Sequence, residues 1–95
     1  MRERKQLHET VKLFKIFSDE TRLRIIALLT EDEFCVRDIC EALEMSQSSI
    51  SHQLKMLRDL NVVKTRRDGK NIFYSLQDVH VREIFEIGFA HANEC

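Results

Sequence analysis

Proline is absent from the 95-residue sequence, and glycine occurs only twice, at Gly69 and Gly88. Because both residue types interrupt helices, their scarcity favours a mostly helical domain. No hydrophobic run approaches the ~18 residues that a membrane-spanning helix requires, so we expect no membrane partner. The first nine residues, MRERKQLHE, lack the apolar stretch of a signal peptide. These absences predict a globular protein of the cytoplasm.

Cysteine is scarce as well. Cys35, Cys40 and Cys95 are too few and too irregularly spaced for the disulfide framework of a small secreted domain. Reduced thiols fit a cytoplasmic protein. A chain of this length builds one hydrophobic core, and we therefore expect a single domain over residues 1–95.

The net charge of −1 argues by itself against a nucleic-acid partner, but the charges are unevenly placed. Residues 46–75 carry a balance of +4, which leaves −5 on the remainder of the chain. A basic central segment on an acidic body is the local electrostatic pattern of a nucleic-acid interface.

Hydrophobic residues at helical spacing predict four helices within residues 4–60. Their expected ranges are 4–17, 20–30, 36–43 and 47–60. Asp19, after Ser18, and Ser46 stand where N-cap residues would begin the second and fourth helices. Arg22 and Arg24 are expected to face solvent.

The third and fourth of these helices are separated by a turn of three to four residues, which predicts a helix-turn-helix. The outward face of residues 47–60 carries serine, glutamine and histidine, where a merely solvated helix would favour glutamate, lysine and alanine. Such side chains suit the base edges and phosphates of double-stranded DNA. The expected base contacts are Gln47, Ser48, Ser51 and His52, and the expected phosphate contacts are Ser49 and Gln53.

Residues 62–77 alternate in character and contain Asp68-Gly69 between two runs of strand-forming residues, which predicts a β-hairpin. Its tip carries Arg66, Arg67 and Lys70, which we expect to contact phosphates. A helix-turn-helix followed by a basic hairpin is a winged helix. The fold class predicted is therefore mostly α with a β-hairpin wing.

Residues 78–95 predict a last amphipathic helix with four side chains that can bind a metal: Asp78, His80, His91 and Glu94. At 100° per residue, His80 and His91 lie about 20° apart around the helix axis, and Glu94 lies about 60° from His91. Along the axis, however, the two histidines are about 16 Å apart. One ion holds its ligands within ~2.2 Å, so a single straight helix cannot bring all four to one metal.

Two antiparallel copies of this helix, one from each of two chains, would bring four such ligands close enough to bind one metal. Asp78 and His80 of one chain would then lie opposite His91 and Glu94 of the other, and two-fold symmetry would create two equivalent sites. Two imidazoles and two carboxylates in a closed tetrahedron suit Zn(II), with Co(II) as a surrogate. The pattern thus predicts a homodimer, in which Gly88 lets the helices approach closely.

Most of the chain resembles the ArsR/SmtB family of small bacterial metal-sensing repressors. The matching stretches are FKIFSDETRLRIIALL (14–29), EFCVRDIC (33–40), MSQSSISHQLKMLRDLNVVKTRRDGKNIFYSL (45–76) and the tail from Asp78. The resemblance implies a winged helix-turn-helix of order α-α-α-α-β-β-α, with N- and C-terminal dimerisation helices. It also implies that the metal-free dimer binds operator DNA, an inverted repeat, and represses transcription. Zinc bound between the C-terminal helices would lower DNA affinity.

A route from the metal to the DNA is predicted through His91. When one ring nitrogen binds metal, the other N–H needs an acceptor. A backbone carbonyl near Leu60 or Asn61, at the end of the recognition helix, is the acceptor we expect. Zinc would then fix the two recognition helices at a spacing that no longer matches successive major grooves.

Two alternatives keep this fold and change the signal. The family has a second metal site for softer ions such as cadmium, built on Cys-x-Cys in the third helix. Here Arg37 replaces the middle cysteine, and Cys35 and Cys40 are turned about 140° apart on a regular helix. A thiol-based redox repressor would instead use Cys35, Cys40 or Cys95. Purely structural zinc is a further alternative, whereas an enzyme is not expected, because four protein ligands leave zinc no open position.

Overall fold

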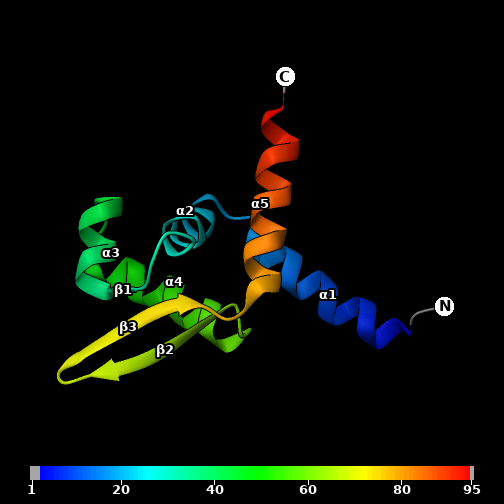
Figure 1. The fold of residues 1–95 in the computed structure, drawn as a ribbon. Helices are drawn as coiled ribbons and strands as arrows, with labels where there is room; N and C mark the ends of the chain where they lie inside the picture. Colours follow the sequence, from blue (N-terminus) through cyan, green and yellow to red (C-terminus); the bar gives the residue numbers. More distant parts are fainter. Residues whose placement is uncertain (1–2, 95) are drawn as a thin grey trace.

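The computed structural model describes residues 3–94. In chain order the elements are α1 (Arg4–Phe17), α2 (Glu20–Leu29), β1 (Phe34–Cys35), α3 (Val36–Leu43), α4 (Gln47–Asp59), β2 (Val63–Asp68), β3 (Asn71–Leu76) and α5 (Val79–Asn93). The predicted order of four helices, a hairpin and a last helix is confirmed, and the protein has the winged helix-turn-helix fold (Figure 1). The strand β1 was not predicted, because two residues are too few to show an alternating pattern.

Side-chain caps begin three of the helices. The Asp19 carboxylate accepts a hydrogen bond of 3.0 Å from the Arg22 backbone N–H, and Ser46 Oγ accepts one of 3.2 Å from the Ser49 N–H. Asp78 Oδ1 likewise accepts from the Val81 N–H at 3.2 Å. Such caps satisfy amides that have no partner within the helix, and they confirm two of the helix starts that the sequence predicts.

The turn between α3 and α4 depends on a left-handed residue. Glu44 has φ 55° and ψ 48°, a conformation that glycine adopts more readily than any side-chain-bearing residue. It lets the Met45 N–H donate to the Cys40 carbonyl at 3.1 Å and so closes the end of α3. The turn therefore sets the angle at which α4 leaves α3.

The sheet has three antiparallel strands in the order β1-β3-β2. In the hairpin, Arg66 is opposite Phe73 and Asp68 is opposite Asn71, so Gly69 and Lys70 form the two-residue turn. Gly69 has φ +62°, which explains the glycine at this position. The hairpin extends away from the helices as the wing (Figure 1).

The core lies between α2, α3, α4 and the base of the sheet. Its fully buried side chains come from each of these elements and are Ile25, Ile26, Leu29, Ile39, Ile50, Leu54, Leu57, Val62 and Val63. Helix α2 contributes three of them and packs against both helices of the helix-turn-helix. This core holds α4 with its polar face outward.

Helices α1 and α5 are mostly outside this core. On α1 only Ile16 is buried, and the predicted apolar face of Leu7, Val11 and Phe14 remains about half exposed, at 53%, 47% and 55%. Both helices project from the end of the molecule opposite the wing tip (Figure 1). No helix in residues 3–94 is long and apolar enough to cross a membrane.

Candidate metal-binding pairs and nucleic-acid interface

The first pair of predicted metal ligands lies at the start of α5. The sequence predicted that Asp78 lies within the helix, but it is the N-cap residue that precedes α5. Its side chain accepts a hydrogen bond from the Val81 N–H. His80 Nδ1 lies 3.7 Å from Asp78 Oδ1. The cap occupies Oδ1, the same oxygen that faces His80, so Oδ2 and the exposed imidazole remain available to a metal.

The second pair lies at the other end of α5. His91 Nδ1 is 3.7 Å from Glu94 Oε1, and the His91 side chain is 84% exposed. The helix ends at Asn93, and Glu94 has left it with φ −73° and ψ 146°. Cys95 lies outside the described residues.

A single chain keeps the two pairs apart. Within residues 3–94, no three histidine, cysteine, aspartate or glutamate side chains come close enough to hold one metal ion. The rise of α5 accounts for this result, because eleven residues separate His80 from His91 by about 16 Å. Each pair supplies one imidazole and one carboxylate, a donor set that fits half of a tetrahedral zinc site.

Next to these pairs, α5 exposes an apolar face. Ile87 and Phe89 are 68% and 60% exposed, and Val81 is the only residue of the helix that is buried among those described. A groove of about 340 Å³ runs beside Gly88, lined by Leu23, Ile84, Phe85, Gly88, Phe89, Ala92 and Asn93. A Cβ added at Gly88 would meet nothing within 4 Å in this chain, so the space beside it is open.

The outer face of α4 presents the residues expected to touch DNA bases. Gln47, Ser48, Ser51 and His52 are all exposed. The two expected phosphate contacts on this helix differ from them, since Ser49 and Gln53 are half-buried. Gln53 Oε1 accepts a hydrogen bond of 3.3 Å from Arg22 Nη1, which ties the amide to α2.

That contact overturns one prediction about α2. Arg22 does not face solvent, since it also donates from Nε to the Ile16 carbonyl at 2.9 Å and from Nη2 to the Lys15 carbonyl at 3.2 Å. The last carbonyls of a helix lack partners within it, and an arginine can satisfy several at once. Arg24 is exposed, as predicted, although its Nη2 donates to the Leu43 carbonyl at 3.2 Å.

The three basic residues of the wing are exposed, but their surroundings differ. Arg67 and Lys70 have no ion pair within the described part of the chain. Arg66 donates from Nε to both carboxylate oxygens of Glu33 at 2.9 Å, and its guanidinium lies 4.7 Å from the centre of the Phe73 ring. These hydrogen bonds from Arg66 lower the pKa of the Glu33 carboxyl below its usual value.

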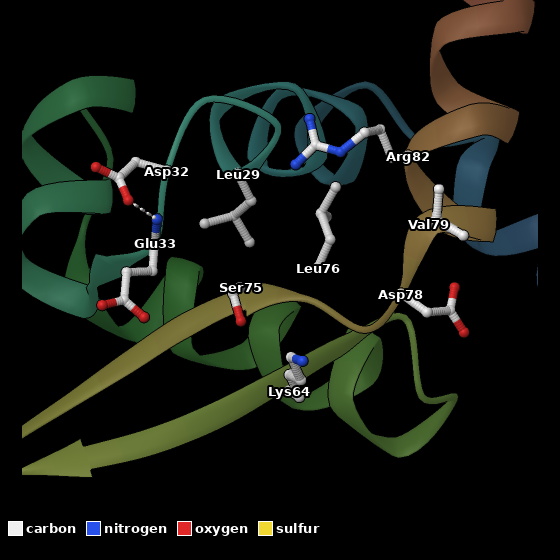
Figure 2. A pocket seen from close by; sticks show the side chains of 9 residues that line it. All are labelled: Leu29, Asp32, Glu33, Lys64, Ser75, Leu76, Asp78, Val79 and Arg82. Carbon is white, nitrogen blue, oxygen red and sulfur yellow. Dashed lines mark hydrogen bonds between the residues drawn. The ribbon is translucent and has the colours of Figure 1, made fainter.

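Sequence reasoning missed Glu33, which belongs to the acidic connection between α2 and β1. A pocket of about 460 Å³ lies beside this connection, and Asp32, Glu33, Lys64, Asp78 and Arg82 are the charged residues that line it (Figure 2). Arg82 donates from Nη1 to the Thr30 carbonyl at 2.6 Å. The Glu33–Arg66 and Arg82–Thr30 contacts leave no local signal in the sequence, because the two partners of each lie more than thirty residues apart in the chain.

The two described cysteines are free thiols. Cys35 is the N-cap of α3 and Cys40 lies on the same helix, and both are half-buried. No group of three metal-binding side chains in residues 3–94 includes either cysteine. Within residues 3–94 of one chain, these two thiols therefore meet no third ligand for a soft metal.

Comparison with known proteins gives consistent similarities. The model of the family described as "Bacterial regulatory protein, arsR family" matches residues 19–65. A cadmium resistance transcriptional regulatory protein CadC homolog of Staphylococcus aureus is 40% identical over 90% of this chain and 72% of its own length. A transcriptional repressor SmtB homolog of Synechocystis sp. is 38% identical over 94% of this chain and 67% of its own length. The homodimeric winged helix-turn-helix DNA-binding domain of Mb0332 from Mycobacterium bovis superposes with a TM-score of 0.90, at 27% identity, over 99% of this chain and 89% of that one.

Proposed function

The chain belongs to the ArsR family of bacterial regulatory proteins, which are DNA-binding transcriptional regulators and not enzymes, and on that premise we propose that it is a zinc-responsive repressor. The repressor acts as a homodimer on double-stranded operator DNA, an inverted repeat, in the cytoplasm. Zinc binding lowers its affinity for the operator and permits transcription. By thermodynamic reciprocity, DNA lowers its affinity for zinc by the same factor.

One observation carries the zinc assignment. Two exposed histidine–carboxylate pairs stand at opposite ends of α5, each with its nitrogen and oxygen 3.7 Å apart. Zinc, when bound, takes four such nitrogen and oxygen ligands in a closed tetrahedron. We propose that Asp78 and His80 of one chain and His91 and Glu94 of the other complete each site.

Dimerisation is supported by the apolar faces that the single chain leaves uncovered. A small monomer rarely exposes so many large apolar side chains to water. The exposed ones are Leu7, Val11 and Phe14 on α1 and Ile87 and Phe89 on α5. The homodimeric state of the Mycobacterium bovis domain agrees with this proposal. Residues 1–95 then form one winged-helix domain, with α1 and α5 as its dimerisation helices.

A heterodimer tests whether the ligands come from two chains. Homodimers of His80→Gln or of His91→Gln lose one ligand from both sites and should bind no tight zinc. In a heterodimer of the two variants, one site carries both changes and the other is intact. We expect one tight zinc per heterodimer, measured by metal analysis after separation with two affinity tags. A heterodimer without tight zinc would contradict a site shared between chains.

The DNA-facing residues are proposed as the sequence predicts them. Gln47, Ser48, Ser51 and His52 read base edges from α4, while Ser49, Gln53 and the wing residues Arg66, Arg67 and Lys70 contact phosphates. The exposure of the base-reading set supports the first assignment. The hydrogen bond from Arg22 uses the amide oxygen of Gln53 and leaves its amide nitrogen free to donate to a phosphate.

We propose that His91 couples the metal to the recognition helix. Within one chain the C-terminal end of α5 points away from α4 (Figure 1). The acceptor near Leu60 or Asn61 therefore belongs to the partner chain. The variant His91→Asn tests this route, because zinc should no longer release DNA from it. Normal release from this variant would show that the route is wrong.

Cadmium is the rival metal, because the Staphylococcus aureus relative is named as a cadmium resistance regulator. Cadmium prefers thiolate ligands, and redox sensing also requires thiols. The double variant Cys35→Ser, Cys40→Ser lacks the two described thiols, so it separates cadmium or redox sensing through them from zinc sensing. The zinc response should survive in this variant. Its loss would favour a thiol-based sensor of the same fold.

A further inference from the structure

The wing arginine Arg66 is held by a carboxylate from outside the wing. Glu33 precedes β1, yet both of its oxygens accept hydrogen bonds of 2.9 Å from Arg66 Nε, and Arg66 Nη2 also donates to Oε1. On the other side, Arg66 Nη1 lies 3.9 Å from Asp68 Oδ2. Carboxylates thus face every nitrogen of this guanidinium.

The backbone on both sides of the Glu33 side chain is held in place by its neighbours. The Asp32 side chain accepts a hydrogen bond of 2.8 Å from the Glu33 N–H, and the next residue, Phe34, pairs with Tyr74 in the sheet. At the start of the same segment, Arg82 holds the Thr30 carbonyl. Figure 2 shows Asp32, Glu33 and Arg82 around this segment, with the Glu33 side chain directed toward the sheet. The fold therefore fixes the backbone position from which Glu33 reaches Arg66.

The negative charge of Glu33 affects how strongly Arg66 can bind a DNA phosphate. A free arginine gains from meeting a phosphate because counterions leave the DNA. An arginine that already faces a carboxylate must first give up that partner, and the released carboxylate then repels the phosphate. Arg66 is 53% exposed, so a phosphate can reach it once Glu33 has moved.

We propose that Glu33 competes with DNA phosphate for Arg66, so that the wing contacts DNA through this arginine only when the Glu33–Arg66 ion pair opens. This inference rests on the proposed DNA-binding function. Because phosphate contacts carry no sequence information, the ion pair weakens binding to all sequences, while base contacts from α4 are untouched. Glu33 thereby lowers the affinity for all DNA by a similar factor and leaves the preference for an operator unchanged.

The opposite role for Glu33 is to position the wing. In that case the ion pair would persist in the complex, and its removal would weaken DNA binding. The two roles predict changes of opposite sign in affinity, so one experiment separates them.

The test compares Glu33→Gln with Glu31→Gln, which removes the same charge from the same connection at a residue without an ion pair in the described chain. Binding of metal-free protein to a fluorescein-labelled duplex of random sequence is measured by anisotropy over a range of salt concentrations. Glu33→Gln should bind several-fold more tightly than Glu31→Gln at low salt. Its dependence of log K on log salt should be steeper by about 0.9, which corresponds to one added phosphate contact.

Arg66→Gln and the double variant Glu33→Gln, Arg66→Gln complete the test. Without Arg66 there is nothing to compete for, so the double variant should exceed Arg66→Gln in affinity only by the small factor by which Glu31→Gln exceeds the wild type. Equal affinity of Glu33→Gln and Glu31→Gln, or weaker binding by Glu33→Gln, would overturn this inference and leave the proposed repressor function intact. If the wild-type protein fails to bind the duplex at all, both are wrong. Thermal unfolding of each variant confirms that it is folded, and Glu33→Asp, which retains the charge but shortens the side chain, should give the same sign of change.

Discussion

The guanidinium of Arg82 donates a hydrogen bond of 2.6 Å from Nη1 to the carbonyl oxygen of Thr30, and so joins α5 to the C-terminal end of α2. The last carbonyls of a helix have no partner within it, and a cation is favourable there. Arg82 is two residues from His80. The contact therefore holds the helix with the candidate metal ligands against the body of the protein.

Loss of this contact should destabilise the fold. Arg82→Gln removes a charge-assisted hydrogen bond from a half-buried site, so the free energy of unfolding should fall by about 1 kcal/mol. Urea unfolding followed by circular dichroism measures the change. Arg67→Gln is the matched control, because Arg67 is exposed without an ion pair in the described chain, and it should change stability little. Equal stability of the two variants would mean that the Thr30 contact contributes nothing.

The turn before α4 yields a prediction of opposite sign. Glu44 is held at φ 55°, where a side chain is strained and glycine is not. Glu44→Gly should therefore raise the free energy of unfolding by about 0.5–1 kcal/mol, even though glycine is more flexible in the unfolded chain. The same substitution at Glu41, inside α3, should lower it by about 1 kcal/mol. Thermal melts of the two variants should move in opposite directions, and a lower melting temperature for Glu44→Gly would contradict the strain.

Local sequence patterns predicted the five helices and the hairpin, but they did not predict contacts between residues far apart in the sequence. Asp19 and Ser46 mark helix starts because a cap acts within three residues, and Asp68-Gly69 marks the hairpin for the same reason. By contrast, Arg22 and Glu33 look like solvated charges in the sequence. Their partners come from other elements, and only the folded chain shows where an arginine or a carboxylate finds them.

The metal-binding pairs are an intermediate case. Helical periodicity predicted that one chain keeps the ligands His80 and His91 apart, and the structure agrees, since the described residues bring no three such ligands together. Periodicity could not predict that Asp78 caps α5 or that Glu94 lies beyond its end. Both follow from backbone hydrogen bonding at the helix ends, which hydrophobic spacing does not record.

Acid should weaken the stabilising effect of Glu33. Hydrogen bonds from Arg66 hold the pKa of Glu33 below its ordinary value of 4.5. A carboxyl with a lowered pKa in the folded state stabilises the fold above its unfolded pKa, and this contribution is lost as the pH falls through the folded pKa. Glu33→Gln should thus be less stable than wild type at pH 7, and the difference should shrink below about pH 4. Urea unfolding at both pH values measures it, and a difference independent of pH would argue against the ion pair.

The wing residues Arg67 and Lys70 should contribute to DNA affinity, whereas the exposed residues of α4 should contribute to sequence preference. Replacing Arg67 or Lys70 by Gln should weaken binding to all DNA sequences alike and reduce the salt slope by about one. Gln47→Ala should instead change the preference between operator and random DNA and leave the slope unaltered. Anisotropy titrations over a salt series, with both kinds of duplex, measure both properties. A wing variant with altered sequence preference and an unchanged slope would contradict the assignment of that residue.

The most direct measurement is the DNA affinity of one protein preparation without metal and with stoichiometric zinc, with His80→Asn measured in parallel. We predict that zinc weakens DNA binding by the wild-type dimer about 5- to 150-fold, the usual range of an allosteric coupling, and leaves DNA binding by the variant unchanged. A wild-type protein that is monomeric, or that binds DNA equally well in both conditions, would contradict it.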